Sequence, residues 1–198
     1  VMSLATFAYN ILLLMVIAGI IGIGTSSIVA VLGSAGLAVG LALQGSLSNL
    51  AGGVLILLLK PFRVGDYIIT AGAEGTVMSI DIFYTRIATT DNKVVVIPNG
   101  TISNSNVTNT TKQDERMLVL EFTVSLDANI EEVKTEIMKL IEGNERILHE
   151  MNRCVVVDKL TPVNIKMQAK AWTKSEDYWD VKYLLLEQIS IVLQGFRG

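Results

Sequence analysis

The first 59 residues contain no Asp, Glu, Lys, Arg or His, and the charged residues begin abruptly at Lys60. All 16 Lys and Arg and all 19 Asp and Glu follow, at about a quarter of the remaining positions. A quarter is the usual share for a soluble domain, whereas a charge-free run of this length is not. The chain is therefore predicted to join a membrane region to a water-soluble region.

Two apolar stretches lie within the charge-free region, residues 4–23 and 26–43, and each approaches the roughly 20 residues that cross a bilayer as a helix. A signal peptide is disfavoured because no basic residue precedes the first stretch and the stretch is too long. The chain begins at Val1 without an initiator Met, so upstream sequence is expected. Lys60 and Arg63 are the first cations, which predicts a multi-pass protein of the cell membrane with cytoplasmic soluble domains.

Composition excludes several classes of partner. The single cysteine, Cys154, cannot form an internal disulfide, and its apolar surroundings predict a small buried side chain. The net charge is −3 and no basic stripe is present, so a nucleic-acid partner is not expected.

Residues 30–45 place small side chains on two flanks of a helix wound at about 100° per residue. The flanks are Gly33, Gly36 and Gly40 on one side, and Ser34, Ala38 and Ala42 on the other. Small residues let helices approach closely in lipid. A groove that receives a ridge from a second copy can close into a ring. Packing against another helix of the same chain is the alternative.

Leu37 and Leu41 lie between the two flanks, one helical turn apart, and would face the axis of such a ring. Two stacked rings of leucine form an apolar constriction that blocks ions by dewetting. Each glycine weakens the helix by up to about 1 kcal/mol relative to alanine, and an inert anchor has no use for that weakness.

The helix is predicted to break at Gln44-Gly45, with Gly45 as the kink. Residues 46–59 open polar and close apolar, and at roughly 21 Å as a helix they are too short to cross a bilayer. We expect them to lie along the cytoplasmic membrane interface, with Asn49, Lys60 and Arg63 as interface residues.

Three segments together resemble the small-conductance mechanosensitive channel (MscS) family: Ala30 to Gly53, Pro-Phe-Arg-Val-Gly-Asp-Tyr at 61–67, and Ile-Pro-Asn-Gly at 97–100. The resemblance runs from near Ser27 to about Phe196. It implies a homoheptamer whose pore is lined by residues 26–44, above a cytoplasmic cage built from a β domain and an α/β domain.

The resemblance also assigns roles to residues of this chain. It implies a leucine seal at Leu37 and Leu41, a kink at Gly45, and close packing at Ala30, Gly33, Ser34, Gly36, Ala38 and Gly40. Residues 1–23 correspond to the second transmembrane (paddle) helix of the family. The family's first transmembrane helix and its C-terminal cage strand have no counterpart here. Ser34 departs from a purely apolar ridge, and its hydroxyl is expected to bond to the Ala30 carbonyl.

The soluble part divides at a polar linker, residues 108–114. Residues 60–112 are predicted to form a small all-β (Sm/SH3-like) barrel with strands at 67–70, 75–80, 83–90, 94–97 and 102–107. Residues 113–198 are predicted to form an α+β, ferredoxin-like domain. Its expected elements are strand 117–124, helix 130–142, strands 154–160 and 164–172, and helix 178–193.

No active site, metal site or cofactor site is apparent in the sequence. The only histidine, His149, lies in a charged stretch and is interpreted as a solvated surface residue. Glu131, Glu132 and Glu136 share a helix with Lys134 and Lys139, which is typical of a solvated face carrying ion pairs. The protein is therefore not expected to be an enzyme.

The function predicted from these features is a tension-gated, weakly selective channel that releases ions and small solutes on hypo-osmotic shock. Its expected partners are further copies of itself, membrane lipids and the permeating solutes. One alternative is an exporter of small solutes such as amino acids on the same scaffold. A second alternative is a ligand-binding module that the helices merely anchor in the membrane.

Overall fold

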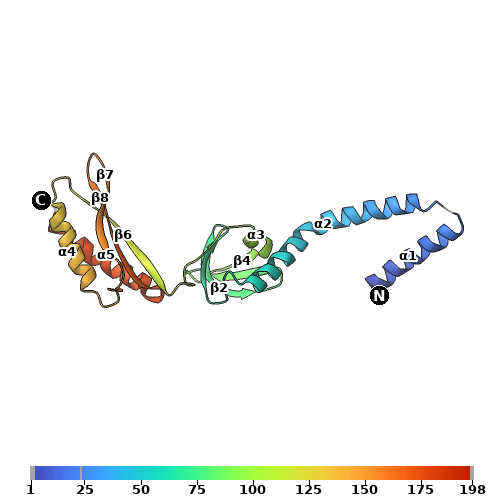
Figure 1. Cartoon of the computed structure of the whole chain (residues 1–198), viewed down its shortest axis with the longest axis horizontal. Coiled ribbons are helices and arrows are strands. Elements are labelled where there is room, and N and C mark those ends of the chain that lie inside the picture. Colours follow the sequence, from blue (N-terminus) through green and yellow to red (C-terminus); the bar gives the residue numbers. More distant parts are fainter. Residues whose placement is uncertain (1–2, 23, 197–198) are drawn as a thin grey trace.

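The chain forms three regions that follow one another in sequence and in space (Figure 1). The computed structural model describes residues 3–22 and 24–196, and predictions that concern the remaining positions lie outside the described residues. Two helices occupy the N-terminal end, a five-stranded β domain lies in the middle, and an α/β domain lies at the far end.

The N-terminal region consists of α1, Leu4–Ile20, and α2, Ser26–Leu59. Ser3 caps α1 by accepting a hydrogen bond from the Thr6 amide at 3.2 Å. Gly22, at φ 80°, supplies the left-handed backbone of the turn that follows α1. The 17 residues of α1 span about 25 Å, whereas α2 is both long and apolar enough to cross a membrane.

The predicted helix break at Gln44-Gly45 is wrong. The helical hydrogen-bonding pattern of α2 continues from Ser26 to Leu59 through both residues. Figure 1 nevertheless shows that the helix axis changes direction along its length, between the end near α1 and the end against the β domain. A glycine can therefore permit a bend without ending the helix, because the backbone bonds are retained.

The β domain is an antiparallel sheet with strand order β4-β3-β2-β1-β5. Its elements are β1 Tyr67–Thr70, β2 Ala73–Ile80, β3 Tyr84–Ala88, β4 Val94–Pro98, α3 Asn99–Ser103 and β5 Val107–Asn109. Its buried core includes Phe62, Ile68, Val77 and Ile87, and Ile56 of α2 joins this core.

The predicted strand at residues 102–107 is wrong. Asn99–Ser103 form the short helix α3, and the strand begins only at Val107. Ile102 is β-branched, which favours a strand, but here it is buried in the β-domain core from a helical turn. Tertiary packing overrides the local preference at this point.

The α/β domain contains β6 Glu115–Val124, α4 Ile130–Glu142, β7 Cys154–Leu160, β8 Ile165–Lys174, the 3₁₀ turn Ser175–Asp177 and α5 Tyr178–Gln194. The strands form an antiparallel sheet in the order β6-β8-β7. Alternate residues of β6 and β8, among them Leu118 and Met167, are buried together with Val133 of α4 and Leu185 of α5. Both helices therefore cover the same face of the sheet.

Most local predictions for this domain are confirmed, but the prediction of a buried Cys154 is wrong. The Asn129 side chain accepts a hydrogen bond from the Glu132 amide at 3.4 Å and begins α4 at the expected residue. Lys134 pairs with Glu131, and Lys139 with Glu136, each at 2.7 Å, so this face carries exposed ion pairs. His149 is exposed, as expected, whereas Cys154 is only partly buried.

Candidate functional site

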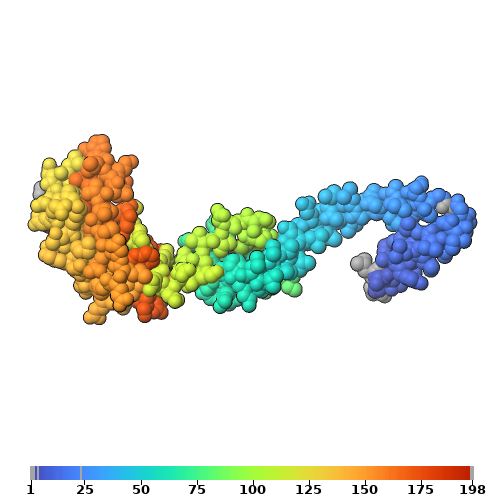
Figure 2. Space-filling view, in the orientation of Figure 1, coloured from blue at the N-terminus to red at the C-terminus, as the bar shows by residue number. Residues whose placement is uncertain are grey.

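The candidate site is α2, and its N-terminal half presents its side chains to the surroundings. Leu37 and Leu41, the predicted seal, are 67% and 63% exposed and lie one turn apart on the same face. Figure 2 shows this half of the helix extending well clear of the β domain. Exposed leucines on a charge-free helix favour burial against lipid or another protein chain.

The glycine flank of this half is open. A Cβ atom built on Gly33, Gly36 or Gly40 would meet no atom within 4 Å apart from the adjoining backbone of its own helix. On the other flank the Ser34 hydroxyl donates to the Val31 carbonyl at 2.8 Å, rather than to Ala30 as expected. The hydroxyl is therefore satisfied within its own helix, and Ser34 presents a compact surface to any neighbouring helix. Ala30 and Ala38 are exposed on the same segment.

The C-terminal part of α2 is docked against the β domain, and two glycines make this possible. A Cβ on Gly52 would lie 2.6 Å from the Asn99 carbonyl oxygen. A Cβ on Gly53 would overlap the Ile82 carbonyl oxygen and lie 2.6 Å from Asn99 Nδ2. Both glycines are buried, so here the helix backbone itself packs against the loops of the sheet.

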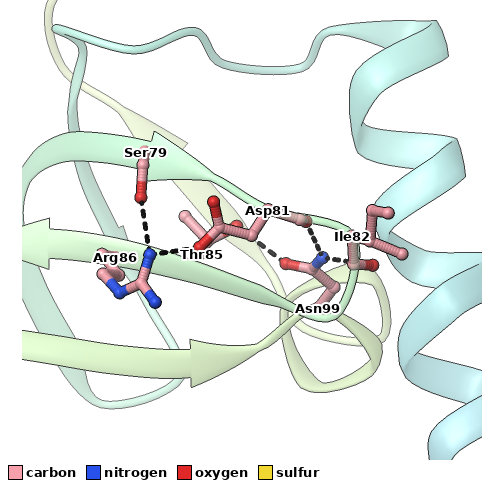
Figure 3. A network of polar contacts seen from close by, with 6 residues as sticks. All are labelled: Ser79, Asp81, Ile82, Thr85, Arg86 and Asn99. Carbon is pink, nitrogen blue, oxygen red and sulfur yellow. Dashed lines mark hydrogen bonds and ion pairs between the residues drawn. The ribbon is translucent and has the colours of Figure 1, made fainter.

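Asn99, the first residue of α3, is fully buried at the centre of this joint (Figure 3). Its Nδ2 donates to the carbonyls of Asp81 at 2.8 Å and Ile82 at 3.1 Å. Its Oδ1 accepts from the Thr85 hydroxyl at 2.8 Å. The side chain thus satisfies three polar groups that burial would otherwise penalise.

An ion pair lies at the β2–β3 loop, which supplies the Asp81 and Ile82 carbonyls that Asn99 contacts. Arg86 on β3 pairs with Asp81 and also donates to the Ser79 hydroxyl at 3.3 Å (Figure 3). The pair is about half exposed, so it contributes little stability by itself. Its position beside the Asp81 carbonyl that Asn99 holds indicates that it orients the β2–β3 loop under α2.

Asn49 links α2 to α3 directly. Its Oδ1 accepts a hydrogen bond from the Gly100 amide at 3.0 Å. A Cβ on Gly100 would lie 2.8 Å from both Asn49 Oδ1 and Ser48 Oγ, so a side chain there would displace these two polar groups. Asn49 is therefore a docking residue, and its expected membrane-interface position stays a prediction.

The Pro-Phe-x-x-Gly-Asp segment forms the turn after α2. Lys60 ends the helix in a left-handed conformation at φ 48°, and the Phe62 side chain is 1% exposed in the β-domain core. Gly65 adopts φ 97°, which favours glycine. Asp66 Oδ2 accepts from the Arg63 amide at 2.8 Å and closes the turn. Lys60 and Arg63 are exposed on its outer side.

Two groups in the described part of the chain have shifted pKa values. The shifted groups lie outside α2: burial, with help from the Glu74 charge, raises the pKa of Tyr67. A hydrogen bond from Lys93, followed by one from Thr89, lowers the pKa of Asp91. Within residues 3–22 and 24–196, no three His, Cys, Asp or Glu side chains could together hold a metal ion.

Sequence reasoning did not identify the docking residues Gly52, Gly53 and Thr85, and it quoted Asn99 only as part of a motif. Asn99 carries a signal for a turn, because it lies between Pro98 and Gly100, but that signal does not reveal its partners. Thr85 carries none, since a threonine is ordinary in a strand. The structure brings Asn49, Gly52 and Asn99 together, whereas Leu37 and Leu41 lie on the separate, exposed half.

Two family models match the soluble part. "Mechanosensitive ion channel, beta-domain" matches residues 45–112, and "Mechanosensitive ion channel MscS, C-terminal" matches residues 118–194. The chain is 40% identical over 162 residues to the small-conductance mechanosensitive channel of Edwardsiella ictaluri, covering 82% of this chain and 57% of that protein. An uncharacterized MscS family protein of Buchnera aphidicola is also 40% identical, over 167 residues, covering 82% of this chain and 59% of its own length.

The fold agrees with these matches. The crystal structure of Helicobacter pylori MscS in a closed state superposes with a TM-score of 0.86 at 30% identity, covering 98% of this chain and 77% of that one. The chain spans a little under three fifths of the length of the curated relatives named above, at 57% and 59%. The two family models together cover more than half of the chain, and the chain belongs to the MscS family of mechanosensitive channels.

Proposed function

We propose that this chain is the subunit of a tension-gated, weakly selective channel of the cell membrane that releases ions and small solutes on hypo-osmotic shock. The observation that carries the proposal is the contrast along α2: an exposed, charge-free half bearing Leu37 and Leu41, and a half fixed to the β domain. Membership of the MscS family supports it, since relatives carry the name of mechanosensitive channels.

The exposed half has the surface that a ring of identical helices needs. Gly33, Gly36 and Gly40 leave open space on one flank, into which the Ser34 and Ala38 side of a second copy would pack. Such heterologous contacts can close into a ring. We expect seven copies from the family resemblance. Leu37 and Leu41 would then narrow the axis and exclude water.

Gating follows from the two-part helix. Tension favours the state with the larger area in the membrane plane, as a ligand favours the state that binds it better. The docked half holds the lower end of α2, so a change in tilt concentrates in the half above it, with Gln44 and Gly45 as the proposed hinge. No charged residue lies between Ser26 and Leu59, and we therefore expect weak selectivity.

The soluble domains would form a cytoplasmic cage below this pore. The sheet order β4-β3-β2-β1-β5 supports an Sm/SH3-like assignment for the β domain. The β-α-β-β-α element order and the sheet order β6-β8-β7 support a ferredoxin-like assignment for the α/β domain.

The test is patch-clamp recording of Leu41→Ser in membrane patches. A ring of hydroxyls should hydrate the constriction, so the channel should open at lower tension. Leu43→Ser is the matched control, because Leu43 lies on the opposite side of the helix from the proposed axis. An unchanged tension threshold in Leu41→Ser, or an equal reduction of the threshold in both variants, would show that Leu41 is not part of the seal.

Cross-linking in native membranes tests the assembly separately. A ladder that ends at seven copies is expected. Monomers and dimers alone would favour the anchored ligand-binding module instead.

A further inference from the structure

Three cations lie together at the turn after α2, and we call them the basic elbow: Lys60, Arg63 and Lys112. Lys112 comes from the segment after β5, and its Nζ donates to the Pro61 carbonyl at 3.5 Å. All three side chains line one hollow of about 520 Å³. The fold thus brings a lysine from the polar linker to the end of the membrane helix.

These cations have no acidic partner within the part of the chain that the structure describes. Six other basic residues there pair with a carboxylate within 4 Å: Arg86, Lys93, Lys134, Lys139, Arg146 and Arg153. Asp66 is the one carboxylate that lines the hollow. Its Oδ2 already accepts from the Arg63 amide at 2.8 Å and from Asn109 Nδ2 at 2.7 Å. The hollow therefore keeps a net positive charge.

Exposed aliphatic side chains border the basic elbow. Leu58 and Leu59 are 74% and 72% exposed, and Val64 is 60% exposed. A second hollow of about 380 Å³ shares Lys60 and Arg63 with the first and is otherwise apolar, lined by Ile56, Leu57, Phe62, Val64 and Ile80. Apolar surface that ends at unpaired cations is complementary to an acyl chain that ends in a phosphate.

We propose that the basic elbow binds the phosphate headgroup of an anionic phospholipid, while the lipid's acyl chain lies against Leu58, Leu59 and Val64. The Arg63 guanidinium and the two ammonium groups donate charge-assisted hydrogen bonds to the phosphate oxygens. The exposed leucines favour a lipid over free inorganic phosphate, because a small anion would leave them in water. The inference rests on the proposed position of α2 in the membrane.

The site ties together two segments that are distant in sequence. Lys60 and Arg63 belong to the end of α2, whereas Lys112 directly precedes the α/β domain. A bound headgroup therefore bridges the membrane helix and the linker, which neither segment could do alone. Lys112→Gln tests this bridge most cleanly, because the Lys112 side chain is exposed and its removal leaves no buried group unpaired.

The experiment is native mass spectrometry of the purified full chain in detergent, titrated with phosphatidylglycerol or with phosphatidylcholine. We expect retention of phosphatidylglycerol over phosphatidylcholine, and about fivefold weaker retention in Lys112→Gln, since one basic residue near an anionic lipid contributes roughly this factor. Lys112→Arg should restore retention. Lys159→Gln, which removes an exposed lysine of β7, should leave it unchanged.

Three results would overturn the proposal. They are equal retention of the two lipids, retention of phosphatidylglycerol in Lys112→Gln equal to that of the parent protein, and an equal loss of retention in Lys159→Gln. Displacement of bound phosphatidylglycerol by millimolar inorganic phosphate would also overturn the proposal, because the site would then bind the free anion. Conduction is not part of this measurement. If the lipid preference is lost while tension-gated currents remain, only the proposed lipid site is contradicted. If the currents are absent while the lipid preference remains, only the proposed channel function is contradicted.

Discussion

The two halves of α2 use glycine in opposite ways. In the exposed half, Gly33, Gly36 and Gly40 have open space where a Cβ would stand. In the docked half, Gly52 and Gly53 touch the backbone of Asn99 and the Ile82 loop so closely that a Cβ would overlap them. Glycine therefore serves a contact within the chain in the docked half. In the exposed half it leaves open the surface that the proposed ring would use.

Substituting one glycine from each half should give the largest difference. Gly53→Ala forces a methyl group into the Ile82 carbonyl and to 2.6 Å from Asn99 Nδ2. Overpacking of this kind costs about 1–3 kcal/mol, which exceeds the gain of up to about 1 kcal/mol from alanine's helix propensity. We expect a clearly lower melting temperature of the β domain, measured by circular dichroism in detergent.

Gly40→Ala is the matched substitution in the exposed half. Beyond the adjoining backbone of its own helix nothing lies within 4 Å of a Cβ built there, so the single chain should keep or slightly raise its stability. The cost should fall on assembly, because close helix approach is lost, and cross-linking should show fewer complete rings. Equal melting temperatures for the two variants, or normal rings with Gly40→Ala, would erase the distinction between the halves.

Removing the Asn99 side chain should have an effect of similar size. Asn99→Ala leaves the Asp81 and Ile82 carbonyls and the Thr85 hydroxyl without this partner. Each buried group left unsatisfied costs about 1–3 kcal/mol. We expect a loss at the upper end of that range in urea unfolding of the β domain, and faster proteolysis at the α2–β domain joint.

Asn106→Ala serves as the control for that substitution. Asn106 is exposed, and its side chain makes no hydrogen bond with any residue the structure describes. Its removal should leave the unfolding midpoint unchanged. If the two asparagine variants behave alike, Asn99 does not fix the docked half.

The sequence predicts the regular parts of this fold and misses the joint between them. The bounds of α4 follow from local features alone, because Asn129 caps the helix and Val133, Ile137 and Ile141 recur at helical spacing. The joint depends on partners far apart in sequence: Gly53 meets Ile82, and Gly100 meets Asn49. No local pattern records which loop a helix backbone will contact.

The candidate site divides in the same way. Leu37, Leu41 and the small-residue flanks follow from helical geometry, and they lie exposed on the faces that geometry gives them. The predicted break at Gln44-Gly45 failed because glycine lowers the cost of bending without removing a backbone donor, and α2 keeps its bonds there. Lys112 joined Lys60 and Arg63 only through the fold of β5 and its following turn.

The smallest expected effect concerns a turn that touches neither half of α2. Asp91, between β3 and β4, pairs with Lys93 and accepts a hydrogen bond from the Thr89 hydroxyl, and these contacts lower its pKa. A lowered pKa means that the carboxylate stabilises the fold above its unfolded pKa, near 3.8, and that this stabilisation is lost as the pH falls through the lower folded value.

Asp91→Asn should therefore lower the melting temperature slightly at pH 7 and converge with the parent protein at the acid end of a pH series. Asp158→Asn, which removes an exposed carboxylate of β7 without an ion pair among the described residues, is the control for the loss of one negative charge. The docking of α2 should not respond to either change, because Asp91 lies at the far end of the hairpin from Asn99. A shift in proteolysis at the α2 joint with Asp91→Asn would show instead that the β domain transmits strain from its turns to the docked half.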